Sequence, residues 1–255
     1  ARIPFTPTDA QARVMNEIAA DLAEEIPMNR LLQGDVGSGK TIVALAAMLQ
    51  AVANGRQAAL VAPTELLAEQ HERTLREVLQ HAPMRLELLT GSITGSARRS
   101  LVEDIGAGRV DIVVGTHAIL TKDVIFRDLA VAVADEQHRF GVQQRATLRS
   151  KGSDQTHCPH QLVMTATPIP RTLSLTLFGD LDVSVIDEMP PGRLPVETVA
   201  VDRAGAAAAY ADVAVRASRG ERSFVVVPVI EESPAGLTDL ESHLDRLATG
   251  PLRDC

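Results

Sequence analysis

Aromatic residues are scarce in this chain of 255 residues: they make up 2% of the sequence, with no Trp and a single Tyr, Tyr210. Proteins that bind single strands without sequence preference stack the bases on aromatic side chains. A base-stacking platform is therefore not expected. Any contact with nucleic acid should instead come from backbone amides, hydroxyls and a few cations, the groups that bind phosphates.

Cysteine and an excess of positive charge are also lacking. The two cysteines, Cys158 and Cys255, lie far apart in the sequence, which is typical of a reduced intracellular protein and not of a disulfide scaffold. The formal net charge is −8, which argues against a protein that coats nucleic acid electrostatically. This net charge does not exclude a local track of phosphate contacts.

The chain has no long apolar segment. Residues 42–49 form the longest apolar helical pattern, which is broken at Gln50 and is too short to span a bilayer. No secretory signal is visible at the N-terminus, so we expect no membrane partner. Since Ala1 is not an initiator Met and Cys255 follows a charged segment without a natural stop, we expect a piece of a longer protein.

The sequence GDVGSGKT at residues 34–41 is the most informative feature present. It fits the GxxxxGK[ST] pattern of phosphate-binding loops. Glycines let the backbone turn tightly and direct N–H groups toward phosphate oxygens, and the following helix adds the positive end of its dipole. We predict that Lys40 reaches the β- and γ-phosphates and that Thr41 holds Mg²⁺. The predicted nucleotide-binding loop comprises Gly34, Asp35, Val36, Gly37, Ser38, Gly39, Lys40 and Thr41.

Short apolar runs alternate with helical patterns along most of the chain. Continuous apolar strands separated by helices predict an α/β fold with a mainly parallel sheet, covered by helices on both faces. Strands are predicted at residues 30–32, 58–62, 85–89, 112–114, 129–134, 161–164 and 183–186, and helices at 42–49, 65–79, 97–105 and 171–178.

Polar signals follow several of these strands. Ligands of parallel α/β sheets bind at the carboxyl ends of the strands, so we expect one site along this edge. The signals are the phosphate loop, Pro63-Thr64, Gly115-Thr116, Asp135-Glu136 and Thr165-Ala166-Thr167.

The acidic pair after residues 129–134 predicts the second half of a hydrolytic site. Asp135 is placed to hold Mg²⁺ opposite Thr41, and Glu136 to orient and deprotonate the attacking water. A small-molecule kinase would not need that general base. We expect His138 to link the nucleotide site to the next strand end, although a surface histidine is the simpler alternative.

The two hydroxyls of Thr165 and Thr167 flank Ala166 and can bond to the acidic turn and report hydrolysis. A simple helix cap before Pro170 is the alternative interpretation. The segment His157-Cys158-Pro159-His160 has two His and one Cys, but no second cluster has ligand spacing, so a polar loop is favoured over a metal site.

A linker is predicted at Pro190-Pro191-Gly192-Arg193, where the alternating pattern breaks. We expect a first domain over residues 1–193. Residues 194–255 then contain an extended piece to Val201, a helix over 204–218 and a strand over 223–229, as if a second α/β unit begins there.

Longer strings resemble the RecG family of bacterial ATP-dependent DNA helicases, within superfamily 2. They are GDVGSGKT at 34–41, APTELLAEQH at 62–71, VVGTH at 113–117, DEQHRFG at 135–141 and MTATPIPRT at 164–172. The transcription-repair coupling factor shares a TATPIPRT string, but its acidic motif usually reads DEEH. Gln137 and the segment 190–193 therefore favour RecG.

The resemblance implies a RecA-like P-loop domain and a truncated start of a second one, with ATP and Mg²⁺ as cofactors, in the cytoplasm of a bacterium. It implies that Gln11 reads the adenine edge, and that Arg171 lies near DNA or the interdomain cleft. It also implies a DNA remodelling motor that acts on replication forks and Holliday junctions in repair and recombination. The positions that it places along the DNA backbone are Thr64, Glu65, Thr90, Gly91, Thr116 and His117.

RecG-like proteins also carry an N-terminal wedge domain and a complete second RecA-like domain with an arginine finger, neither of which is found in these residues. An arginine finger is worth about 10³ or more in rate in related hydrolases. We therefore expect the isolated chain to be nearly inactive. The alternatives are a nucleotide switch without turnover, a phosphotransferase for a small substrate, and an RNA helicase.

Overall fold

The computed structural model describes residues 6–136, 147, 151, 158–167, 181–192, 196–202, 204–227, 240–250 and 252–253. The chain divides into two compact units, Ala1–Arg193 and Leu194–Cys255. None of the described helices is long and apolar enough to cross a membrane.

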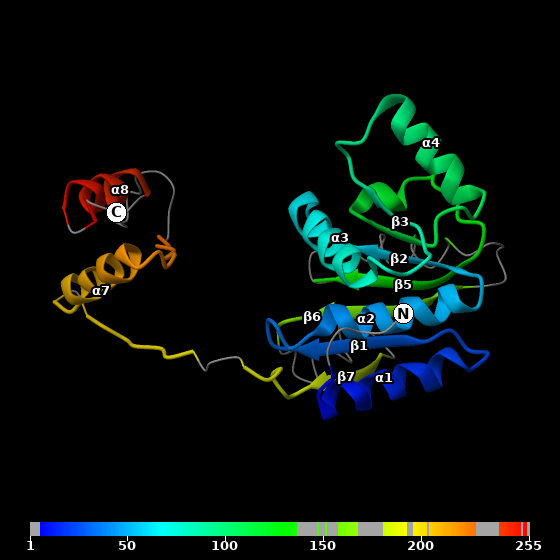
Figure 1. The fold of residues 1–255 in the computed structure, drawn as a ribbon, viewed down its shortest axis with the longest axis horizontal. Coiled ribbons are helices and arrows are strands. Elements are labelled where there is room, and N and C mark those ends of the chain that lie inside the picture. Colours follow the sequence, from blue (N-terminus) through cyan, green and yellow to red (C-terminus); the bar gives the residue numbers. More distant parts are fainter. Residues whose placement is uncertain are drawn as a thin grey trace. The chain divides into compact units, whose positions relative to one another are not determined.

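A seven-stranded sheet forms the centre of the first unit (Figure 1), in the order β3-β4-β2-β5-β6-β1-β7. Every pairing is parallel, so the predicted mainly parallel sheet is confirmed. The strands are β1 Asn29–Gly34, β2 Gln57–Val61, β3 Leu86–Leu89, β4 Ile112–Gly115, β5 Leu129–Asp135, β6 His160–Thr165 and β7 Asp182–Ile186.

Helices cover both faces of this sheet, because successive strand residues point to opposite sides. In β2, Ala58 and Leu60 join a core cluster with α1, α2 and α3, whereas Ala59 and Val61 join a second cluster with α4 and η1. This alternation confirms the predicted two-sided α/β architecture. The helices are α1 Asp9–Leu22, α2 Lys40–Ala53, α3 Glu65–Leu79, α4 Gly95–Gly106 and the 3-10 turn η1 His117–Leu120.

The register of the central strands places the polar strand ends side by side. Met164 of β6 pairs with Asp135 of β5 on one side and with Leu32 of β1 on the other. The exits of β5, β6 and β1 therefore form one half of the carboxyl edge. The exits of β3, β4 and β2 form the other half.

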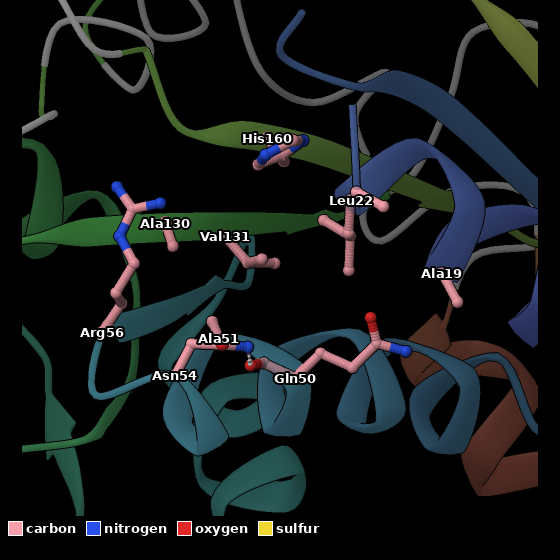
Figure 2. A pocket seen from close by; sticks show the side chains of 10 residues that line it. Ala19, Leu22, Gln50, Ala51, Asn54, Arg56, Ala130, Val131 and His160 are labelled. Carbon is pink, nitrogen blue, oxygen red and sulfur yellow. Dashed lines mark hydrogen bonds between the residues drawn. The ribbon is translucent and has the colours of Figure 1, made fainter. Parts of the chain in front are cut away.

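A cavity of about 450 Å³ opens at the opposite, amino edge of the sheet (Figure 2). Two of its polar side chains, Arg56 and His160, already have partners within the protein. Arg56 makes a bidentate ion pair with Asp128 at 2.7 and 2.9 Å, and the ring Nδ1 of His160 accepts from the Met28 N–H at 3.0 Å. Since these groups are satisfied and lie away from the phosphate loop, this cavity is not the nucleotide site.

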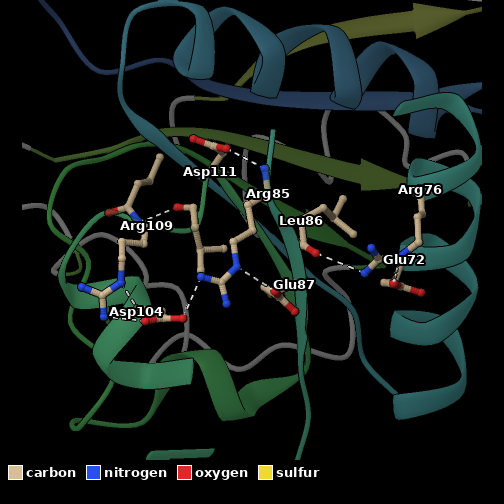
Figure 3. A network of polar contacts seen from close by, with 10 residues as sticks. Glu72, Arg76, Arg85, Leu86, Glu87, Asp104, Arg109 and Asp111 are labelled. Carbon is tan, nitrogen blue, oxygen red and sulfur yellow. Dashed lines mark hydrogen bonds and ion pairs between the residues drawn. The ribbon is translucent and has the colours of Figure 1, made fainter. Parts of the chain in front are cut away.

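An ion-pair network holds the edge strand β3 against α4 (Figure 3). Asp104 near the end of α4 accepts from Arg85 at 2.7 Å and from Arg109 at 2.5 Å. Arg85 also pairs with Glu87 at 2.8 Å, and its backbone N–H donates to Asp111 at 2.6 Å. These contacts fix the start of β3 against the end of α4.

The second unit contains α7 Ala206–Ser218 and α8 Leu240–Thr249 in its described part. The hydroxyl of Tyr210 lies 2.8 Å from the ring Nε2 of His243. The strand expected over residues 223–229 is not formed in its described part, 223–227, where Phe224 and Val226 are both 92% exposed. A strand needs a neighbour for its backbone hydrogen bonds, and this segment pairs with none of the described strands.

Candidate nucleotide-binding and hydrolysis site

The phosphate loop follows β1 and turns through two glycines in left-handed conformations. Gly37 has φ +80° and Gly39 has φ +89°, values that cost an L-residue free energy and glycine none. Helix α2 then begins at Lys40 with no side-chain cap on its first N–H groups. An uncapped helix start that follows a glycine turn is a favourable place for a phosphate group.

Lys40 is the first residue of α2, and its side chain reaches back to the start of this loop. Its ammonium donates to the carbonyl of Gly34 at 2.7 Å and to that of Asp35 at 3.0 Å. The pKa of Lys40 is lowered from its usual value because the side chain is partly buried. The negative charges of Asp135, Glu136 and Asp35 oppose this shift. The phosphate loop and the acidic pair follow β1 and β5, whose exits lie at the same carboxyl edge of the sheet with β6 between them.

Asp135 ends β5 and is 9% exposed. Its Oδ2 lies 2.7 Å from the ring Nε2 of His71 on α3, 64 positions away in sequence. Sequence reasoning missed His71. The signal is its spacing, because it falls in the apolar stripe of α3 between the buried residues Ala68 and Leu75, where a polar side chain needs a partner.

Glu136 has the left-handed backbone conformation, φ +51°, which is uncommon outside glycine. Two contacts with the end of β6 hold it there. Its N–H donates to the Met164 carbonyl at 2.9 Å, and its Oε1 accepts from the Ala166 N–H at 3.2 Å. The carboxylate is thus anchored to the segment that we expect to sense hydrolysis.

The hydroxyl of Thr165 accepts from the Thr167 N–H at 3.1 Å, within its own turn. Among the described residues, the contact between this turn and the acidic pair is made by the Ala166 backbone and not by a threonine hydroxyl. His138 lies outside the described residues, as do Gln137 and Arg171.

Gln11 lies beside the phosphate loop at the start of α1 and is 3% exposed. Its side-chain amide donates to the Ser38 carbonyl at 2.7 Å and accepts from the Thr8 N–H at 3.1 Å. The adjoining cavity of about 430 Å³ is large enough for a small-molecule group. It is lined by Thr6, Thr8, Gln11, Gly39, Ile42, Pro190 and Pro191.

The donor set fits Mg²⁺ bound together with a nucleotide. Mg²⁺ prefers oxygen ligands and needs one or two protein groups when phosphates and water complete its shell. Thr41 and Asp135 supply such oxygens on the same edge of the sheet as Lys40. No group of three or more His, Cys, Asp or Glu side chains that could hold a metal by itself occurs in the described part of the chain.

The positions expected to line the DNA backbone lie at the exits of β2, β3 and β4, in the other half of the carboxyl edge. Thr64 caps α3 by accepting from the Leu67 N–H at 3.3 Å, and Glu65 accepts from the Ser92 N–H at 3.1 Å, next to Thr90 and Gly91. The last two of these positions, Thr116 and His117, lie at the start of η1. Thr116 is buried and caps this turn, whereas His117 is exposed.

Comparison with known proteins agrees with this geometry. The DEAD/DEAH box helicase family model matches residues 8–176. The ATP-dependent DNA helicase RecG of Pasteurella multocida (strain Pm70) is 52% identical over 234 residues, which cover 91% of this chain and 34% of that protein. RecG of Bacillus subtilis (strain 168) is 49% identical, over 95% of this chain and 35% of that protein.

A solved structure of RecG bound to a three-way DNA junction superposes with a TM-score of 0.80 at 40% identity. The match covers 96% of this chain and 32% of the RecG chain, so the present chain spans about a third of the relatives it matches. These similarities confirm the RecA-like helicase fold and the RecG resemblance inferred from the motifs. The chain belongs to the DEAD/DEAH box helicase family, and over most of its length it is similar to RecG.

Proposed function

We propose that this chain is the ATP-binding half of an ATP-dependent DNA helicase that remodels branched DNA at replication forks and Holliday junctions, in repair and recombination. The main support is that the phosphate loop ending in Lys40 and Thr41 and the carboxylates of Asp135 and Glu136 follow β1 and β5 at the same carboxyl edge of the sheet. The RecG names of its relatives, and the three-way junction bound by one of them, support the choice of substrate.

In this proposal the phosphate loop binds ATP through its backbone N–H groups and the Lys40 ammonium. Thr41 and Asp135 hold Mg²⁺, which neutralises charge on the phosphate oxygens. Glu136 orients the attacking water and accepts its proton. The contact between Glu136 and Ala166 then passes the state of the site to the turn at Thr165 and Thr167.

Gln11 serves as the adenine-reading residue in this proposal. Its side-chain amide is buried beside the cavity that adjoins the phosphate loop and is already bonded to Ser38 of that loop. A base bound in the cavity would therefore meet an amide whose position depends on the loop conformation. His138 is proposed as the link from the acidic motif toward the next strand end.

DNA is proposed to bind along the exits of β2, β3 and β4, mainly through its backbone. Thr64, Gly91 and His117 are exposed there and are suited to phosphate oxygens through hydroxyl, backbone amide and ring N–H groups, whereas Thr90 and Thr116 are buried and support this edge from beneath. The low aromatic content agrees with this mode, since it offers little for base stacking.

We further propose that residues 1–193 form the first RecA-like domain and that 194–255 begin the second. The exposed Phe224 and Val226 support this division, because apolar side chains of a segment without sheet partners are suited to burial by the rest of a domain. We also propose that the isolated chain hydrolyses ATP slowly, because an arginine finger from a complete second domain accelerates related hydrolases.

The test compares Lys40→Ala with Lys122→Ala in the full-length protein that contains this chain. Lys122 is exposed and lies outside the proposed site, so it controls for the loss of one positive charge. We expect ATP turnover stimulated by a three-way DNA junction in the wild type and in Lys122→Ala, and a fall of at least about 100-fold in Lys40→Ala. Equal turnover in the two variants would rule out the proposed site.

A further inference from the structure

Helix α3 connects the two halves of the carboxyl edge. Its middle residue His71 lies against Asp135, with 2.7 Å between Nε2 and Oδ2, and both side chains are 12% exposed. An ionised carboxylate only accepts hydrogen bonds, so the ring Nε2 carries the hydrogen and donates. The contact is thus a directed hydrogen bond to the carboxylate proposed to hold Mg²⁺.

His71 is in a position where the helix would normally place an apolar residue. Ala68, Leu75 and Leu79 are buried on the same stripe, at the three- and four-residue spacing of a core-facing helix side. A polar group in such a position costs free energy unless it is bonded. Asp135 is the partner that His71 has in the structure.

The first turn of the same helix is tied to the proposed DNA track. Thr64 caps the helix, and Glu65 accepts from the Ser92 N–H at 3.1 Å in the loop that leaves β3. Thr64 and His71 are seven residues apart, about 10 Å along a helix that rises 1.5 Å per residue. One rigid element therefore contacts both the nucleic-acid side and the Mg²⁺ side.

We propose that His71 is a positioning residue that orients the Asp135 carboxylate and, through α3, couples DNA binding at the first turn of the helix to nucleotide hydrolysis. This inference rests on the proposed function. Without the hydrogen bond the carboxylate can rotate away from the Mg²⁺ position, and a shift of the first turn of α3 no longer reaches it.

The first experiment measures binding of a fluorescent ADP analogue to the full-length protein, with Mg²⁺ and with EDTA. Loss of a residue that orients a metal ligand typically costs 10- to 100-fold in metal affinity. We expect His71→Ala to weaken binding in Mg²⁺ about 10-fold and to leave binding in EDTA unchanged. His71→Gln keeps an N–H donor and should restore binding, and His81→Ala, at an exposed position, should match the wild type.

The second experiment measures the ratio of ATP turnover with and without a three-way DNA junction, at saturating Mg²⁺. We expect this ratio to fall in His71→Ala and to recover in His71→Gln. Unchanged Mg²⁺-dependent binding and an unchanged ratio in His71→Ala overturn the proposal, as does equal weakening in Mg²⁺ and EDTA, or a His71→Gln variant as impaired as His71→Ala. Wild-type and Lys40→Ala turnover in the same assay tests the proposed function separately.

Discussion

The carboxylate of Glu136 and the backbone N–H of Ala166 are joined by a hydrogen bond of 3.2 Å across the exits of β5 and β6. The N–H of Glu136 donates in turn to the Met164 carbonyl at 2.9 Å. Glu136 keeps a left-handed φ of +51°, which costs about 1–2 kcal/mol in a residue with a side chain. The surrounding contacts hold a strained residue in one orientation, as is common at functional sites.

Glu136→Gln tests whether this carboxylate is the general base. The glutamine Oε1 can still accept from Ala166, so the geometry is retained while the basic group is lost. We expect the turnover number of the full-length protein with junction DNA to fall by about 10²–10⁴-fold, with ATP affinity within about twofold of the wild type. ATPase kinetics and equilibrium nucleotide binding check the two parts, and an unreduced turnover number would remove Glu136 from this role.

Gly39→Ala tests the close approach of the phosphate loop to Gln11. A methyl group at Gly39 would lie 2.3 Å from the Gln11 Nε2, and φ is +89°. The left-handed backbone costs alanine about 1–2 kcal/mol, and its methyl group clashes with Gln11. We therefore expect loss of nucleotide binding and a lower unfolding temperature.

The matched control is Gly55→Ala. Gly55 also has a positive φ, +71°, but a methyl group there meets nothing within 4 Å. This variant should lose stability through backbone strain alone and keep nucleotide binding. Equal binding by the two variants in a titration with a fluorescent ADP analogue would contradict the predicted role of the Gly39–Gln11 contact.

His160→Asn tests the half-buried histidine at the start of β6. Burial, and then the charge of Arg56, lower the pKa of His160, while Asp21 raises it. The folded state therefore favours the neutral ring, which accepts from the Met28 N–H. The stability that the neutral ring gives the folded state is fully present above the ordinary histidine pKa of about 6.5. It is lost as the pH falls from there toward the lowered pKa of His160.

Asparagine at position 160 can still accept from Met28 through its Oδ1 but does not titrate. We expect the urea midpoint of the 255-residue chain to fall less between pH 7.5 and pH 5.5 in His160→Asn than in the wild type. His81→Asn, at an exposed position, should follow the wild type. The same pH dependence in all three proteins would show that His160 contributes nothing to it.

Asp104→Asn tests the network at β3 and α4 (Figure 3). Arg109 and then Arg85 lower the pKa of Asp104 through hydrogen bonds. A carboxyl group with a lowered pKa stabilises the folded state at pH values above its pKa in the unfolded chain. This stability is lost as the pH falls through its pKa in the folded state.

The variant should therefore be less stable than the wild type at pH 7, and the difference should narrow below about pH 4. Urea unfolding at both pH values measures this. Glu69→Gln, on the exposed side of α3, removes one negative charge outside the network and should show no such narrowing. A wild-type advantage that persists undiminished at low pH would contradict the assignment.

The sequence predicts a helix or strand correctly where the residues of that element themselves show the cap and the apolar spacing. Helix α3 spans Glu65–Leu79 as predicted, because Thr64 caps it and its apolar residues recur with helical spacing. Strand β1 extends to Asn29–Gly34, beyond the predicted 30–32. Polar residues such as Gln33 belong to it because ladder pairing with β6 and β7 involves the backbone and not the side chain.

The strand predicted at residues 223–229 shows the opposite case. Its apolar, β-branched composition is typical of a strand, yet residues 223–227 form none. Composition records a preference, whereas a strand exists only when a neighbour supplies hydrogen bonds along its length.

The amino-acid sequence by itself determined the phosphate-loop motif, the acidic pair, the seven strands of the first unit and helices α2, α3 and α4, because each depends on residues close together in sequence. It did not predict helix α1, Asp9–Leu22. Only the tertiary structure decided that His71 reaches Asp135, that Glu136 is held by Ala166, and that the proposed nucleotide and DNA positions fall in separate halves of one edge. These relationships depend on which strands become neighbours, and that is set by the packing of distant segments against a common core.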